Sequence, residues 1–219
     1  MDFDRIRTFV KSYIKNDDSS LNELYSDAVK RGVPVIREDT ADYLKVLLAQ
    51  VKPKRILEIG TAVGYSSLFM AEVTDGKAEI DTIELDEKTA DEAEDNFRRY
   101  GRENIINLRR GDAAEVLAQM EEEGGHSYDL VFIDAAKSQY KVYFSYVINM
   151  VHPDSVIVTD NILESGLVLE SHFLVEKRDR TIHDKLREYI YVIKNDERLE
   201  TAILSVGDGI AVSVVKENV

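Results

Sequence analysis

Hydrophobic residues in the first fifty positions recur at helical spacing. Ser20 stands three residues before Glu23, the spacing of a capping box, and Gly32 can end a helix, so a helix is expected from Ser20 to Arg31. After Pro34, apolar residues repeat every three or four positions and predict an amphipathic helix: Ala41, Leu44, Leu47, Leu48 and Val51. The pattern therefore predicts a helical cap over residues 1–52.

From Pro53 onward, short β-branched runs alternate with longer helical patterns. The predicted strands are Arg55–Ile59, Ile80–Glu84, Ile105–Arg109, Leu130–Ile133 and Val156–Thr159. The predicted helices are Ser66–Val73, Glu87–Tyr100, Ala113–Glu122 and Gln139–Met150. A segment without clear period follows Asn161, then a helix at His183–Lys194 and two β-like runs, Thr201–Leu204 and Gly209–Val215.

This alternation predicts a doubly wound, Rossmann-like α/β fold with a seven-stranded, mostly parallel sheet. The run Val131–Ile133 contains no polar residue, as expected for a strand that is covered on both faces. The last two runs are joined through residues 207–209, Gly-Asp-Gly, which predicts an antiparallel hairpin at the sheet edge. We expect one domain, residues 1–219, with the cap at 1–52 and the α/β core at 53–219.

Composition excludes several classes of protein. The 219 residues include no cysteine, which excludes disulfide scaffolds, thiolate zinc sites and thiol nucleophiles. No apolar run approaches the ~20 residues that span a bilayer, and the start, Met1 to Arg5, lacks the apolar core of a signal peptide, so we expect a cytoplasmic protein with no membrane partner. A net charge of −14 argues at first against nucleic acid, although net charge does not describe a local site.

The turns after the first three strands predict an adenosine pocket, because ligands of such sheets bind at the carboxyl ends of the strands. Gly60 and Gly64 follow the first strand, and Ala62 occupies the middle glycine position of a dinucleotide fingerprint, which favours a ligand without pyrophosphate. Glu84 ends the second strand, where a carboxylate can bind ribose hydroxyls. Asp112 can reach an adenine or simply cap the next helix. S-adenosylmethionine fits such a pocket.

The fourth and fifth strands end in residues suited to a divalent cation. Asp134, Asp160 and Asn161 offer hard oxygen ligands from adjacent strands, as Mg²⁺ prefers. Lys137 follows three residues after Asp134. The alternative interpretation is an ion pair between Lys137 and Asp160, with Asn161 capping a turn. The four histidines, at positions 126, 152, 172 and 183, show no metal-ligand spacing and are expected to be structural or solvated.

These motifs together resemble one family. The sequences EIGTAVGYSS, TIELD, GDA, IDAAK, TDN and GDGIAVS are similar to the cation-dependent O-methyltransferases of the catechol and caffeoyl-CoA type. Within that family, VPVIRED, DAAKSQY, TDNIL and KRDR resemble the bacterial tRNA 5-hydroxyuridine methyltransferases, which form 5-methoxyuridine at the wobble position.

The resemblance implies roles for particular residues. Contacts to S-adenosylmethionine are implied for Ile36, Glu58, Gly60, Tyr65, Ser66, Glu84, Asp112, Ala113 and Asp134. Asp134, Asp160 and Asn161 would hold Mg²⁺, Lys137 would be the general base, and a homodimer is implied.

The methyl acceptor is open at this stage. A tRNA acceptor would use the basic residues Lys177, Arg178 and Arg180, whose alternative is ordinary surface charge. A small catechol-like phenol is the second acceptor class. The segment after TDN departs from the catechol enzymes at the place where an aromatic pocket would be shaped, so the acceptor stays open. A non-catalytic nucleotide-binding module is the third hypothesis, and the intact set at Asp134, Lys137, Asp160 and Asn161 argues against it.

Overall fold

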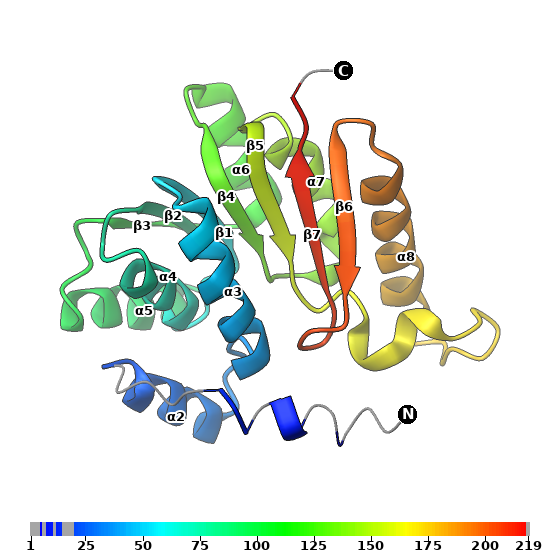
Figure 1. Ribbon diagram of the computed structural model, residues 1–219, viewed down its shortest axis with the longest axis horizontal. Helices are drawn as coiled ribbons and strands as arrows, with labels where there is room; N and C mark the ends of the chain where they lie inside the picture. The colour runs from blue at the N-terminus through cyan, green and yellow to red at the C-terminus, as the bar shows by residue number, and fades with distance from the viewer. Residues whose placement is uncertain (1–4, 6–7, 11, 15–19, 218–219) are drawn as a thin grey trace.

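A seven-stranded sheet forms the centre of the computed structural model, which describes Arg5 and residues 8–10, 12–14 and 20–217 (Figure 1). Its strands are β1 (Arg55–Ile59), β2 (Glu79–Glu84), β3 (Ile106–Arg110), β4 (Tyr128–Ile133), β5 (Val151–Thr159), β6 (Leu199–Leu204) and β7 (Ile210–Val215). They lie in the order β3-β2-β1-β4-β5-β7-β6. Strands β1 to β5 pair in parallel, and β7 runs antiparallel to both β5 and β6.

The predicted doubly wound fold is therefore confirmed, with its C-terminal hairpin at the sheet edge. The direction in which successive strands are added reverses between β1 and β4, where Ile59 lies opposite Ile133. In open α/β sheets, ligands bind in the crevice at such a reversal, outside the carboxyl ends of the strands. The topology therefore places a binding site beside Gly60 and Asp134, which follow directly after these two strands.

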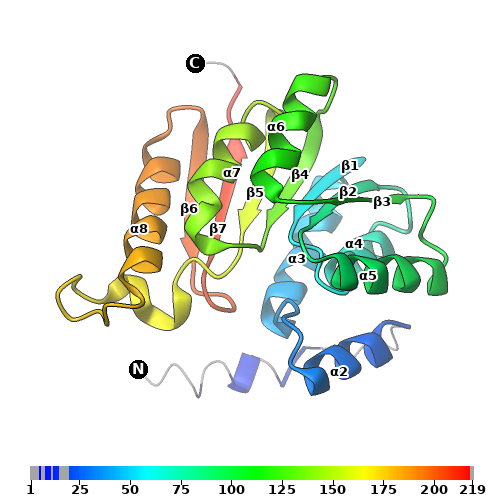
Figure 2. The ribbon, with the colours of Figure 1, turned by 180° about the vertical axis from the view of Figure 1, so that it is seen from behind.

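Helices cover both faces of the sheet (Figures 1 and 2). Their bounds are α2 (Asn22–Arg31), α3 (Glu38–Val51), α4 (Tyr65–Val73), α5 (Glu87–Arg99), α6 (Ala113–Glu123), α7 (Tyr140–Val147) and α8 (Arg180–Asn195), with 3₁₀ helices η1 (Lys137–Gln139) and η2 (Glu164–Leu169). Leu130 and Phe132 pack in the core that contains residues of α2 to α5, whereas Val131 and Ile133 pack in the core with residues of α6 to α8. Burial on both sides explains why this strand has no polar alternation.

Helix α2 packs beside helices α4 and α5. Leu24 and Ala28 are buried, and the Tyr25 ring lies 5.1 Å from the ring of Tyr65 in α4, measured between centroids. Arg31 forms an ion pair with Glu92 of α5. Gly32 ends the helix with φ of 71°, as predicted. The chain then passes through residues 32–37 beside the carboxyl ends of the strands before α3 begins.

Several details differ from the sequence predictions. The capping box at Ser20 and Glu23 is wrong: Leu21 is the N-cap residue of α2 and no side chain caps the helix. The Ser20 hydroxyl instead lies 3.5 Å from a carboxylate oxygen of Glu72, a contact across 52 residues that no local pattern contains. Part of the expected cap, including Met1 and residues 15–19, lies outside the described residues.

Element boundaries also shift where tertiary contacts extend or shorten them. Strand β5 starts at Val151 rather than Val156 because Tyr128 pairs with Val151 after a register shift. The predicted helix at Gln139–Met150 is a 3₁₀ turn followed by the shorter α7, and α8 starts three residues earlier, at Arg180. Among the residues that the structure describes, no helix is both long enough and apolar enough to cross a membrane.

Candidate active site

A cavity of about 850 Å³ opens at the carboxyl ends of β1, β2, β4 and β5. Its wall includes the segment before α3, the turn after β1, the ends of β2 and β4, and the chain from Asp160 into η2. Eleven residues predicted for the cofactor, the cation or catalysis lie on it: Ile36, Gly60, Tyr65, Ser66, Glu84, Asp112, Ala113, Asp134, Lys137, Asp160 and Asn161. The topology thus brings together residues separated by up to 125 positions.

The turn after β1 requires glycine at two positions. Gly60 has φ of 101°, and a Cβ atom there would lie 2.1 Å from the backbone oxygen of Asp134. Gly64 has φ of 84°, and a Cβ atom there would lie 2.5 Å from the Phe97 ring. Any side chain at Gly60 would therefore push β1 and β4 apart at the point where the two strands diverge. The backbone can line the cavity only because these side chains are absent.

Glu84 organises this turn and still has capacity for a ligand. One carboxylate oxygen, Oε2, accepts a hydrogen bond from the Ala62 amide at 2.8 Å. The other, Oε1, accepts from the amides of Leu85 and Asp86, both at 3.0 Å. An ionised carboxylate has about four acceptor positions, so one position on Oε2 stays available for a hydroxyl group in the cavity. Glu84 therefore stabilises the turn and can still accept a hydrogen bond from a ligand in the cavity.

Asp112 is the N-cap residue of α6. Its Oδ1 accepts hydrogen bonds from the amides of Ala114 and Glu115, at 2.9 and 3.3 Å. The capping alternative considered for this residue is therefore confirmed. Asp112 also lies on the cavity wall, so the same carboxylate can cap the helix and face a ligand through its second oxygen.

Asp134 and Asp160 place two carboxylates at neighbouring strand ends. Asp160 is 1% exposed, and burial together with the charge of Asp134 raises its pKa to about 7. Burial also raises the pKa of Asp134, although a hydrogen bond from Asn161 and the charge of Lys137 act in the opposite direction. Two carboxylates this close, one buried and one partly buried, repel each other unless a proton or a cation lies between them.

Asn161 completes the group. Its amide nitrogen Nδ2 donates to Asp134 Oδ1 at 2.8 Å, and its backbone has φ of 57°. Carboxylate and amide oxygens form the donor set that hard divalent cations take. Asp208 lies on the same wall, and its charge further raises the pKa of Asp160.

Lys137 does not pair with Asp160, which removes the alternative ion pair considered from the sequence. Its ammonium group instead contacts the carboxylate of Glu164 at the start of η2. Both side chains are about one-quarter exposed on the cavity wall. Glu164 was not identified from the sequence, because it lies in the segment without periodicity and 27 residues from its partner.

Comparisons with known proteins decide the family. A sequence model described as O-methyltransferase matches residues 11–216. The chain belongs to the O-methyltransferase family. It is 29% identical to a catechol O-methyltransferase of Niastella koreensis, over 98% of both chains, and 31% identical to caffeoyl-CoA O-methyltransferase 2 of Populus trichocarpa, over 78% of this chain and 71% of the relative.

Solved structures of the family agree with the fold. An O-methyltransferase from Bacillus cereus in complex with SAH has a TM-score of 0.83 and 27% identity, covering 97% of both chains. An SAH-bound methyltransferase from Podospora anserina has a TM-score of 0.84 and 26% identity, covering 98% of this chain and 95% of that one. The family resemblance predicted from the sequence is thus confirmed.

Glu58 is the one implied cofactor residue of this methyltransferase that does not lie on the cavity wall. It is fully buried, and one of its carboxylate oxygens accepts hydrogen bonds from the hydroxyls of Ser67 and Thr82. Burial raises its pKa to about 7. Thr82 also lies 2.6 Å from the Thr61 hydroxyl, so Glu58 connects to the glycine turn through two threonines.

The basic residues predicted for RNA lie outside the cavity wall, around the start of α8. Arg178 forms ion pairs with Glu176 and Asp179, and the Arg180 guanidinium donates to the backbone oxygen of Val175. Lys177 is exposed. The acidic neighbours of Arg178 thus neutralise part of the positive charge expected at an RNA-binding surface. The RNA role of all three residues remains a prediction.

Proposed function

We propose that this chain is an O-methyltransferase that uses S-adenosylmethionine and a divalent cation, Mg²⁺, to methylate one of two adjacent oxygens on its acceptor. The observation that carries the proposal is a pair of carboxylates at neighbouring strand ends, the buried Asp160 and the partly buried Asp134, beside Asn161 and Lys137. Family membership, the large cavity and the SAH-bound structures of relatives support the same activity.

The cofactor would occupy the side of the cavity bounded by β1, β2 and β3. Glu84 Oε2 has an acceptor position for a ribose hydroxyl, and Asp112 lies at the start of α6 on the adenine side. Gly60 lets the backbone approach the amino-acid end of the cofactor, while Ile36, Tyr65, Ser66 and Ala113 line the same space. This assignment leaves the wall from Asp134 to Glu164 for the acceptor.

The residues present fit a hard cation. Asp134, Asp160 and Asn161 supply oxygen donors, and the raised pKa of Asp160 indicates that a proton or cation is favoured between the two acids. When bound, Mg²⁺ would act as a Lewis acid that lowers the pKa of an acceptor hydroxyl. The nearby charge of Asp208 adds to the attraction for a cation.

Lys137 would remove the proton from the acceptor hydroxyl. Its amine lies on the acceptor side of the cavity, where the Glu164 carboxylate fixes its position. A lysine acts as a general base only through its neutral amine. Glu164 would therefore position Lys137 before the reaction, and the rest of the task is to align the acceptor oxygen with the methyl group.

For the acceptor, we propose 5-hydroxyuridine at the wobble position of tRNA. This nucleoside presents its hydroxyl beside the O4 carbonyl, and therefore offers two adjacent oxygens as a catechol does. The sequence motifs of the segment before α3 and of residues 134–140, with the basic residues before α8, support this acceptor. The local ion pairs of Arg178 are an argument against strong RNA binding.

A small catechol-like phenol is the second candidate, and the relatives favour it. Matched proteins include a catechol O-methyltransferase over nearly the full chain and several caffeoyl-CoA O-methyltransferases. Both acceptors would use the same cation and the same base. The assembly of two copies into a homodimer remains a prediction under either acceptor.

The deciding experiment compares the two acceptors with the same purified protein. Methyl transfer from S-adenosylmethionine would be measured on tRNA that carries 5-hydroxyuridine and on a simple catechol, each with Mg²⁺ and with EDTA. We expect methyl transfer to the tRNA, and we expect EDTA to abolish this transfer. In a deletion strain, nucleoside mass spectrometry should show loss of 5-methoxyuridine and accumulation of 5-hydroxyuridine. An unchanged nucleoside profile together with turnover of the catechol would replace the tRNA acceptor by the phenol.

A further inference from the structure

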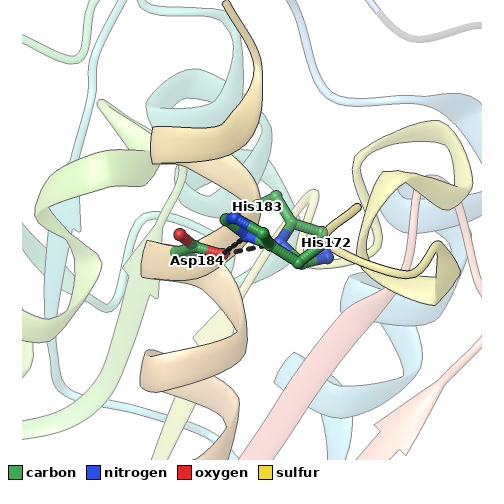
Figure 3. A group of neighbouring side chains, drawn as sticks. All are labelled: His172, His183 and Asp184. Carbon is green, nitrogen blue, oxygen red and sulfur yellow. Dashed lines mark hydrogen bonds and ion pairs between the residues drawn. The ribbon is translucent and has the colours of Figure 1, made fainter. Parts of the chain in front are cut away.

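Three potential metal ligands meet outside the active site, between η2 and α8. His172 lies on the loop after η2, and His183 and Asp184 lie near the start of α8 (Figure 3). One ligand atom from each of the three lies within 4.8 Å of the others. The sequence does not predict this arrangement, because His172 and His183 are eleven residues apart and the loop after η2 brings them together.

The hydrogen-bond geometry of this cluster does not fit a neutral His183 ring beside an ionised Asp184 carboxylate. His183 Nε2 lies 3.1 Å from the backbone oxygen of Glu170, and since a carbonyl only accepts, this nitrogen must carry a hydrogen. In a neutral ring, Nδ1 of His183 then has a lone pair, yet it lies 2.8 Å from Asp184 Oδ1. Two acceptors would face each other at this distance unless a proton or metal cation lies between them.

The second histidine converges on the same atom. Nδ1 of His172 also lies 2.8 Å from Asp184 Oδ1. Two imidazole nitrogens therefore surround one carboxylate oxygen, as the dashed lines in Figure 3 show. If protons alone filled these positions, both Nδ1 atoms would have to donate to the single Oδ1 atom of Asp184, although His183 Nε2 already donates to Glu170 and the His183 side chain is 2% exposed.

A metal ion would take the Nδ1 lone pairs of both rings and the Asp184 carboxylate oxygen together. Metal-binding histidines usually donate their other N–H group to a carbonyl or carboxylate, which fixes the ring and its tautomer. His183 already has this partner in Glu170. Two imidazole nitrogens and one carboxylate form a donor set typical of Zn²⁺, with a fourth position for water.

We propose that His172, His183 and Asp184 form a second metal site, which binds Zn²⁺ or a similar transition-metal ion. Its nitrogen donors distinguish it chemically from the all-oxygen group at Asp134, Asp160 and Asn161. This site does not depend on the identity of the methyl acceptor.

The site would fix the segment that borders the active site. Glu164 at the start of η2 contacts Lys137, and Val168 near its end accepts a hydrogen bond from Arg187 of α8 at 3.2 Å. The bond from His183 to Glu170 is a second connection between this segment and α8. A metal bound by His172 would add a third, strong connection, so we expect metal binding to make η2 and the following loop more rigid.

Cobalt provides the test, because its visible spectrum reports the ligands. Metal-free protein would first be saturated with Mg²⁺ and then titrated with Co²⁺. We expect one equivalent of Co²⁺ with the intense absorption of a four-coordinate site that includes nitrogen ligands, displaced by Zn²⁺. Co²⁺ among six oxygens absorbs weakly, so the signal separates the two sites. It should persist in Asp160→Asn, which alters only the oxygen site.

Variants at exposed ligands locate the site without disturbing the core. His172→Ala and Asp184→Asn should each weaken Co²⁺ and Zn²⁺ binding by at least about 10-fold, since even the loss of a supporting group costs that much. His152→Ala is the matched control, because His152 is equally exposed and also contacts a carboxylate, Asp129. Zn²⁺ should also slow hydrogen exchange in residues 164–174 of the wild type and of His152→Ala, but not of His172→Ala. Absence of the intense signal in the wild type, or its persistence in His172→Ala, would overturn the proposal.

Discussion

Replacing Asp160 by asparagine should stabilise the protein while it removes activity. The asparagine side chain has the same size and keeps an oxygen that can accept a hydrogen bond from the backbone N–H of Asn161, as Asp160 Oδ1 does at 2.7 Å. What disappears is a charge that burial and the neighbouring Asp134 both oppose. If these acids are arranged to bind a cation, their repulsion lowers the free energy of unfolding of the wild-type protein without a cation. The Asp160→Asn variant avoids this loss.

The size of the effect follows from the pKa. The folded pKa of Asp160 is about 7, against an ordinary 3.8. At about 1.36 kcal/mol for each pH unit between these values, the cost reaches up to about 4 kcal/mol. A carboxyl with a raised pKa takes up a proton on folding, so its contribution is favourable at low pH and is lost as the pH rises from about 4 to about 7. The advantage of Asp160→Asn should therefore grow across this interval.

Thermal unfolding in EDTA provides the assay. At pH 8 the variant should melt roughly 10 °C higher than the wild type, and the difference should shrink toward pH 4. Adding Mg²⁺ should raise the melting temperature of the wild type more than that of the variant, because binding to the folded state stabilises it. The reasoning fails if Asp160→Asn is no more stable at pH 8, or if the difference is the same at every pH.

Three further predictions test single contacts. Lys137→Ala should lower turnover by at least ~100-fold with unchanged binding of S-adenosylmethionine by calorimetry, whereas Lys141→Ala on α7 should leave both intact; normal turnover in the first variant would remove Lys137 as the base. Gly60→Ala should abolish cofactor binding or folding because its Cβ would meet a backbone oxygen at 2.1 Å, whereas Gly101→Ala, where nothing lies within 4 Å, should cost only about 1 kcal/mol in denaturant unfolding. Glu58→Gln should remove part of the loss of stability that the wild type shows as the pH rises from about 4.5 to about 7, since burial raises the pKa of Glu58 to about 7; an unchanged pH profile would show that this carboxyl does not titrate there.

Local patterns were sufficient to predict the order of the elements. Strand β1 begins and ends at the predicted residues, and the apolar run in β4 correctly indicated burial on both faces. Once the strands are parallel, their carboxyl ends meet at one edge, so the sequence could also place Glu84, Asp134 and Asp160 around one cavity. The glycine turn could also be predicted from the sequence, because a positive φ and a close approach of the backbone both favour glycine.

What the sequence could not supply are contacts between segments that have no periodicity or that lie far apart. The partner of Lys137 is Glu164 rather than Asp160, and Glu58 lies in the core rather than on the cavity wall. His183 is buried and meets His172 through a loop whose path no local rule predicts. The sequence by itself determined the fold and which strand ends carry the chemistry, because side-chain periodicity and strand direction are local properties. Only the tertiary structure decided which charged groups pair, because that depends on distances between segments that packing alone sets.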